Sequence, residues 1–296
     1  MNLTSTDNLD CIRARTATEH ILGILNDESL YDKDIRPAVI GGGPVVVSIV
    51  PNRFILLTMD QQMETIEYFC EFMLMWKDPK LSWDIGGDAG FAAEWIKIPE
   101  KFLWTPDIVF GRSLSDKDMI DKKVRWADMR NDGTVRKSGP AVIESKCELD
   151  IRQFPYDYQT CIVTMGSWSF DRTEIYVQSF YPNITIDEEF FVGNNEWDLE
   201  TIVAIPTAEL WYGGNFSIVN YQIDLKRRPV YYVLVIQAPA FIIGTLTLFG
   251  IFMPFSVHGE RRERVTLGLT MLLSISMTFE LVSDMMPKAS RLPLLG

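Results

Sequence analysis

The chain has 296 residues, of which 47% are hydrophobic and 23% are charged, and this length supports a large hydrophobic core in one or two domains. The formal net charge of −12 argues against nucleic acid as a partner, because nucleic-acid binding needs a basic surface. The four cysteines form no C-x-x-C pair and only two histidines are present, so the sequence predicts no metal site, no histidine-based catalysis and no cofactor.

The part of the chain before residue 229 predicts one helix followed by short strands. Residues 5–26 have a partial apolar face at helical spacing. Residues 67–76 alternate, with one wholly apolar face, as expected for a half-buried strand. Asn131-Asp132-Gly133 predicts a hairpin turn. Many short strands after one helix indicate a mainly β protein with a sandwich architecture.

Two N-glycosylation triplets lie in this region, at Asn183-Ile-Thr185 and at Asn215-Phe-Ser217, and a third begins at Asn2. Such triplets also arise by chance. They are consistent with an extracellular location for the β-rich part, with Asn183 and Asn215 as the candidate attachment sites.

Residues 230–255 contain no charged side chain. At about 1.5 Å per residue the run exceeds a hydrocarbon core of about 30 Å, so it predicts a membrane-spanning helix in contact with lipid. Arg227 and Arg228 flank it, and Tyr231 and Tyr232 suit the interface between membrane and water. The alternative is a long buried helix of a soluble protein.

A second apolar segment, residues 265–286, carries a polar stripe at helical spacing. Ionisable groups are unfavourable in lipid, so this stripe predicts a face toward water, and several copies around one axis would enclose a channel. The alternative is a stripe packed against other helices, where hydroxyl groups are common. The stripe comprises Thr266, Thr270, Leu273, Met277, Glu280 and Asp284.

Cys147 and Cys161 bracket thirteen residues with Phe-Pro-Tyr-Asp at their centre. This spacing and motif resemble the signature loop of the Cys-loop receptors, the pentameric ligand-gated ion channels. Further segments match the family in order, and the resemblance is to the nicotinic acetylcholine receptor branch. These segments are WKDPKLSW (76–83), WTPD (104–107), Arg227-Arg228-Pro229, ERVTLGLTMLLS (263–274) and the loop from Met286 to Gly296.

The resemblance implies an immunoglobulin-like extracellular sandwich with an N-terminal helix in residues 1–228. It implies membrane helices at 229–255 and 265–286, the second lining the pore, and the start of the next loop at 287–296. It implies a Cys147–Cys161 disulfide, two free thiols being the alternative, and it assigns Asp157 and Arg227 to the coupling of ligand binding to the pore. The expected location is the plasma membrane, and more narrowly the postsynaptic membrane.

The resemblance places an agonist site for a small amine-type neurotransmitter between neighbouring subunits of a homo- or heteropentamer. Its aromatic residues here are Trp168, Trp211, Tyr212 and Phe216, although a core role is the alternative for Trp168. The chain also departs from the family pattern. No adjacent cysteine pair precedes Phe216, and Gly111 and Glu71 replace aromatic residues, so part of the box is missing. Either a carboxylate holds the ligand, or the subunit does not bind agonist by itself.

Carboxylates at both ends of the predicted pore helix, Glu263 and Asp284, favour cations, although Arg261 and Arg262 add positive charge nearby. Leu273 is the expected hydrophobic gate. The sequence thus predicts a ligand-gated cation-channel subunit. An accessory subunit without a complete box, a truncated isoform without channel activity, and a ligand-binding protein without a channel are the alternatives. An enzyme is not expected. Family members have two further membrane helices after the position of Gly296, so the sequence is expected to be truncated after the second.

Overall fold

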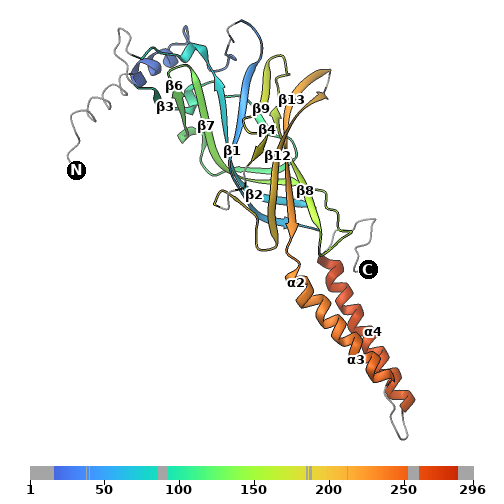
Figure 1. Ribbon diagram of the computed structural model, residues 1–296. Helices are drawn as coiled ribbons and strands as arrows, with labels where there is room; N and C mark the ends of the chain where they lie inside the picture. Colours follow the sequence, from blue (N-terminus) through green and yellow to red (C-terminus); the bar gives the residue numbers. More distant parts are fainter. Residues whose placement is uncertain are drawn as a thin grey trace, which may run out of the picture.

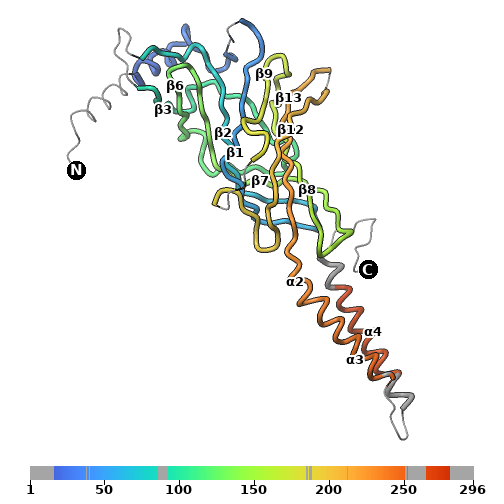
Figure 2. Tube along the Cα trace, in the orientation of Figure 1, coloured from blue at the N-terminus to red at the C-terminus, as the bar shows by residue number. Residues whose placement is uncertain are grey.

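A computed structural model describes residues 17–285 except 38, 40, 86–92, 185, 187–188, 212 and 253–259. Residues 251, 260–264 and 281–285 are described for their backbone alone. The described chain has two parts, a β-sandwich and a pair of antiparallel helices that project from one end of it (Figures 1 and 2).

The described chain begins with a helix over residues 17–26, which matches the end of the predicted helix; residues 5–16 lie outside the description. Ala17, Ile21 and Leu25 are buried at a spacing of four, so they form the stripe that packs on the sandwich.

The larger sheet has eight strands, in the order β11-β1-β2-β7-β6-β3, with β5 paired to β7 and β9 paired to β1. Tyr68, Cys70 and Trp76 of the predicted alternating strand are buried, as their apolar face requires. The strands are β1 (Val45–Asp60), β2 (Thr65–Lys77), β3 (Trp95–Pro99), β5 (Ser113–Asp118), β6 (Trp126–Arg130), β7 (Thr134–Lys146), β9 (Ile175–Ser179) and β11 (Phe191–Val192).

The smaller sheet has five strands, in the order β10-β12-β13-β8-β4. Phe72 of the larger sheet and Tyr221 of the smaller one pack with ring centroids 5.4 Å apart, which places the core between the sheets. The disulfide between Cys147, just after β7, and Cys161 in β8 joins the two sheets. The strands are β4 (Ile108–Phe110), β8 (Tyr158–Ser167), β10 (Asn183–Ile184), β12 (Trp197–Trp211) and β13 (Gly214–Arg227).

The predicted hairpin turn joins β6 to β7, and Gly133 has a φ of 83°. A side chain at this position would be strained, and its Cβ would lie 2.3 Å from the carbonyl oxygen of Asp78. Three short 3₁₀ turns complete the sandwich: η1 (Pro79–Leu81), η2 (Glu100–Phe102) and η3 (Lys122–Val124).

After β13 the chain enters a helical run made of α2 (Val230–Tyr232), the π-helix η4 (Val233–Gln237) and α3 (Ala238–Phe252). Pro239 has no backbone N–H, so the helix lacks one hydrogen-bond donor at this position. The wider π turns lie in the residues before this proline. Among the described residues, the segment Val230–Gly250 is the one helix long and apolar enough to cross a membrane.

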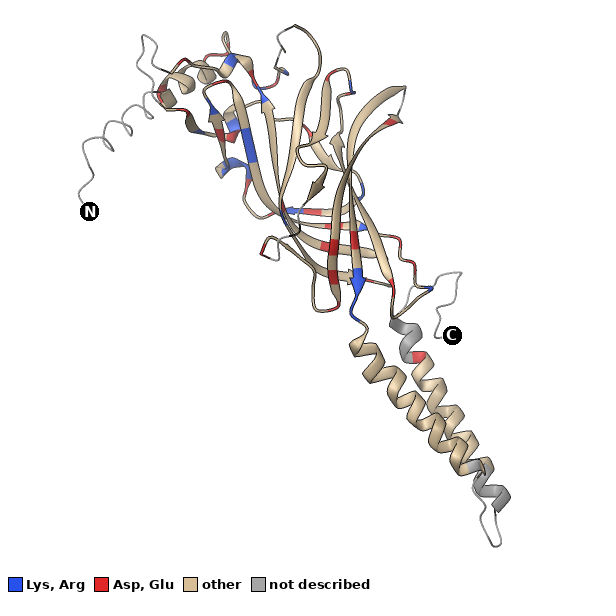
Figure 3. Cartoon of the chain, viewed as in Figure 1, with Lys and Arg blue, Asp and Glu red and all other residues tan. Residues whose placement is uncertain are grey.

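The second helix, α4 (Glu260–Met285), runs back beside α3. A Cβ added at Gly250 would lie 2.9 Å from Leu267, so the two helices approach closely at this glycine. Figure 3 shows charged residues distributed over the sandwich and almost none on the described part of the two helices, which suits an apolar environment.

Candidate functional site

The end of β13 carries a buried ion pair at the point where the sandwich meets the first helix. The side chains of Arg227 and Asp157 are 0% and 1% exposed. Arg227 Nε donates to Asp157 Oδ1 at 2.7 Å and Nη2 donates to Oδ2 at 3.1 Å. Gln159 Nε2 also donates to Asp157 Oδ2, at 2.6 Å. The pair is therefore bidentate and oriented, which is the arrangement that a buried charge pair needs.

A second carboxylate, Glu196, extends the ion pair to two further segments. Its Oε1 accepts hydrogen bonds from Arg227 Nη1, from the Tyr232 hydroxyl at 2.7 Å and from Gln61 Nε2 at 3.0 Å. Gln61 lies in the β1–β2 turn, Glu196 directly before β12, and Tyr232 in α2. We call Arg227, Asp157, Glu196, Tyr232 and Gln61 the hub.

Aromatic rings enclose the guanidinium of the hub. Arg227 Cζ lies 4.1 Å from the ring centroid of Trp197 and 4.9 Å from that of Phe154. Phe154 and Tyr232 are in edge-to-face contact at 4.8 Å. These rings exclude water and add cation–π attraction to the ion pair. The hub is thus tied to Tyr232, at the start of the helix, by packing as well as by hydrogen bonds.

At the other end of β8, Trp168 lies on a loop organised by Asp107, the last residue of the WTPD segment. Asp107 Oδ1 accepts from the Ser167 hydroxyl at 2.5 Å, and Oδ2 accepts from the backbone N–H of Ser169 at 2.7 Å. Trp168 is 69% exposed. The core alternative for this tryptophan is therefore wrong, and the ring is open to a ligand or a partner.

Two more of the predicted aromatic residues come together on the β12–β13 hairpin. Trp211, 40% exposed, and Phe216 have ring centroids 5.9 Å apart. The Trp168 loop is held to this hairpin, because the backbone N–H of Arg172 donates to the carbonyl of Asn215 at 2.7 Å. Tyr212 lies outside the described residues.

The two positions that depart from the family pattern carry no ring. Gly111 donates its N–H to the Thr164 carbonyl at 2.8 Å. Glu71 lies on β2, where its Oε1 accepts from the Ser138 hydroxyl at 2.6 Å. Glu71 and Ser138 therefore form a polar patch on the larger sheet, where an aromatic residue is expected in agonist-binding subunits.

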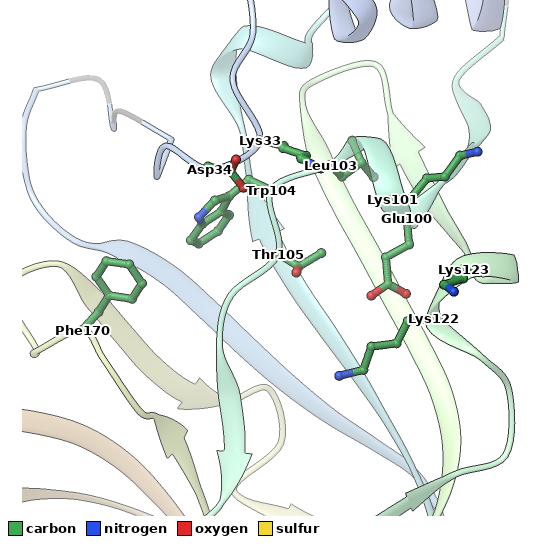
Figure 4. Close-up of a pocket in the computed structure, with 10 residues that line it drawn as sticks. All are labelled: Lys33, Asp34, Glu100, Lys101, Leu103, Trp104, Thr105, Lys122, Lys123 and Phe170. Carbon is green, nitrogen blue, oxygen red and sulfur yellow. The ribbon is translucent and has the colours of Figure 1, made fainter. Parts of the chain in front are cut away.

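A cavity of about 470 Å³ lies beside η2 and η3, and Figure 4 shows the side chains that line it. Four lysines, Lys33, Lys101, Lys122 and Lys123, are set against the carboxylates of Asp34 and Glu100. This excess of positive charge opposes the binding of a cationic amine, so the candidate amine site is the aromatic cluster and not this cavity.

The predicted pore stripe lies on α4, where the side chains of Thr266, Thr270, Leu273, Met277 and Glu280 are exposed. Leu272 is also 67% exposed, so a single chain does not distinguish a pore-lining face from a lipid-facing one. The side chains of Glu263 and Asp284 lie outside the described part.

Asn183 and Asn215 are both exposed, as attachment of a glycan requires. The sequence predictions named Asp157 and Arg227 but missed Glu196 and Gln61, and they gave Tyr232 only an interfacial position. No local pattern marks Glu196, whose partners come from β13, the β1–β2 turn and α2.

Residues 18–229 match the neurotransmitter-gated ion-channel ligand binding domain. The betaine receptor acr-23 of Caenorhabditis elegans is 30% identical over 281 residues, which cover 88% of this chain and 51% of the relative. The proton-gated ion channel subunit pbo-6 of the same organism is 29% identical over 241 residues, which cover 80% of this chain and 54% of the relative. The neuronal acetylcholine receptor subunit beta-4 of Gallus gallus is 27% identical over 286 residues, covering 96% and 58%. The chain thus spans about half the length of these relatives.

Proposed function

The chain belongs to the neurotransmitter-gated ion-channel family, and we propose that it acts as a subunit of a pentameric, cation-selective channel opened by an extracellular amine. The family consists of membrane-embedded channels with an extracellular ligand-binding domain, so the chain is not an enzyme. Residues 1–228 form the proposed extracellular domain, and the helices at 229–255 and 265–286 form the proposed membrane spans. A postsynaptic membrane is the proposed location.

The hub is the observation that carries this proposal. A charge pair as buried as Arg227 and Asp157 stabilises a structure only if further hydrogen bonds and contacts offset the cost of removing both charges from water. Here these contacts come from segments that meet the first helix. Removing one partner of such a pair typically destabilises by about 3–5 kcal/mol. The sandwich and the helix are therefore joined tightly enough for movement in one to bias the other, as ligand gating requires.

The aromatic cluster supports an amine as the ligand. Trp168, Trp211 and Phe216 offer ring faces, and Tyr212 is a further proposed member. A cation over such faces gains about 0.5–2 kcal/mol per ring. The curated relatives are named for betaine, protons and acetylcholine, so the choice of an amine rests on the aromatic side chains of this chain.

An accessory role is the second candidate, and Gly111 and Glu71 favour it. Because these positions lack rings, a homomer would bind an amine weakly, and a neighbouring subunit of another type would have to supply the missing aromatic residues. Cation selectivity is proposed from Glu263 and Asp284, which would form carboxylate rings at the two mouths of the pore.

The test is voltage clamp of cells that express the receptor containing this chain, alone and with a related subunit that carries the missing aromatics. We expect acetylcholine to evoke cation current with the partner and little or none without it. Trp168→Ala should reduce the response where this chain provides that face, and Tyr181→Ala, at a tyrosine that is 51% exposed, serves as the control. Surface expression without current under any partner would support the accessory role. Failure to enter the plasma membrane would refute both.

A further inference from the structure

The register of the β12–β13 hairpin brings a carboxylate to its aromatic face. Glu209 is paired with Phe216, and Trp211 is paired with Gly214. Directly paired residues of an antiparallel ladder share one face, and so do residues two apart along a strand. Glu209, Trp211 and Phe216 therefore lie on the same face, and the 5.9 Å contact between the two rings agrees with this assignment.

The Trp168 loop lies at the same end of the hairpin. The β13–β8 ladder ends at the pair Ile218 and Gly166. Phe216 lies two residues before Ile218, and Trp168 lies two residues after Gly166, so both aromatic residues lie just beyond the same end of this ladder. The hydrogen bond from Arg172 to Asn215 holds the loop at the hairpin.

Glu209 is half-buried as a residue, whereas the adjacent Leu210 on the opposite face is 79% exposed. Within the described part of the chain, no hydrogen bond or ion pair engages this carboxylate. Partial burial of a charge beside aromatic rings is unfavourable without a partner of opposite charge. Elsewhere on β12, Asp198 forms a salt bridge with Arg228, and Glu200 forms one with Lys226, so Glu209 differs from these two carboxylates.

We propose that Glu209 is the charged member of the ligand site and that it selects small monocationic amines over zwitterions. This inference rests on the proposed function and identifies the class of amine. An ammonium group placed among Trp168, Trp211 and Phe216 would gain attraction from the ring faces and from the carboxylate together. A zwitterion such as betaine carries its own carboxylate, which Glu209 would repel at this short distance.

Choline and betaine test the proposal, because they share a trimethylammonium group and differ in a hydroxyl or a carboxylate. Each compound is applied as activator or competitor to the receptor containing this chain and its partner subunit. We expect wild type to prefer choline. Glu209→Gln should lower the apparent affinity for choline by about tenfold to a hundredfold, which is the range for losing a contact to a charged group. The apparent affinity for betaine should stay unchanged or improve.

Glu200→Gln is the matched control, since Glu200 is exposed on the same strand and far from the hairpin end. A second variant, Glu209→Cys, allows the charge to be changed on receptors already at the surface. Modification with a sulfonate-bearing thiosulfonate should restore the preference for choline. Modification with a trimethylammonium-bearing reagent should not.

Two results would overturn the inference, and they are distinguishable. Loss of choline action in Trp168→Ala but not in Glu209→Gln would leave the amine site standing and remove Glu209 from it. No action of either compound on wild-type receptors with any partner would refute the proposed amine site together with the role of Glu209.

Discussion

Replacing Tyr232 by phenylalanine tests whether the hub couples the sandwich to the first helix. The change removes one hydroxyl, which donates to Glu196 Oε1 at 2.7 Å and accepts from Arg227 Nη1 at 3.4 Å. The ring remains and keeps its edge-to-face contact with Phe154 at 4.8 Å. The perturbation is therefore confined to the hydrogen bonds of one hydroxyl at the joint.

A hydrogen bond to a charged group contributes about 1.5–3 kcal/mol. Glu196 keeps Gln61 and Arg227 as partners, so the fold should survive the loss. If the bond transmits movement, the gating equilibrium should shift by roughly tenfold to a hundredfold, since each 1.4 kcal/mol corresponds to a factor of ten. We expect a smaller maximal current for the same number of receptors at the surface.

The assay is voltage clamp with surface labelling of the same cells. Tyr231→Phe is the matched control: this tyrosine precedes Tyr232, is 57% exposed, and its hydroxyl engages no described residue. In the background of Glu196→Gln, the Tyr232→Phe change should add little, because the two residues share one interaction. Equal effects of Tyr231→Phe and Tyr232→Phe, or full additivity with Glu196→Gln, would refute the reasoning.

Three further predictions concern the core, a buried charge network and the pore. Burial raises the pKa of the Cys70 thiol to about 12, whereas the thiol of an unfolded chain has a pKa of about 8.5. Alkylation at pH 8, followed by mass spectrometry, should therefore label Cys70 far faster in the unfolded protein than in the folded one. Because the folded pKa is the higher one, the free energy of unfolding that depends on this thiol should also fall as pH rises above about 8.5. Glu100→Gln should lower the free energy of unfolding by about 3–5 kcal/mol, measured by denaturant titration. Lys137 Nζ, at 2.5 Å from Glu100, would lose its buried counter-charge, and Arg125 would keep only the more exposed Asp118, at 3.0 Å; a loss below about 1 kcal/mol would contradict this. Glu263→Gln should lower cation conductance and shift the reversal potential toward weaker cation preference, and unchanged values would assign selectivity elsewhere.

The sequence was informative where structure follows from local pattern. The alternating strand at 67–76, the Asn131-Asp132-Gly133 turn and the charge-free run at 230–255 depend on neighbouring residues. The structure has the strand and the turn, and within the charge-free run it has an apolar helix over Val230–Gly250 that is long enough to cross a membrane. The Cys147–Cys161 disulfide followed from the resemblance of a continuous loop to one family, and it is present.

The sequence was silent where the site depends on strand register and on long-range contacts. Glu196 meets Arg227, Tyr232 and Gln61, which are 31, 36 and 135 residues away along the chain. Glu209 is set beside Phe216 by a ladder whose register is fixed by the whole hairpin. A shift of one residue in that register would turn Glu209 to the opposite face, so no inspection of composition or spacing could have assigned it.

The two candidate sites are connected by a single strand, which gives the proposed function a physical route. β13 (Gly214–Arg227) runs from the hairpin to the start of the helices (Figure 1), and it carries Phe216 near its first residue and Arg227 at its last. At about 3.3 Å per residue, the eleven steps between them span roughly 36 Å. The strand is hydrogen-bonded along its length to β12 and from Ile218 to Lys226 to β8, so it resists stretching and local bending. A ligand that draws the hairpin toward Trp168 therefore acts on a stiff element whose far end is the guanidinium of the hub. Because that guanidinium is enclosed by Asp157, Glu196 and Trp197, it cannot be displaced without disturbing Tyr232 and the start of the helix.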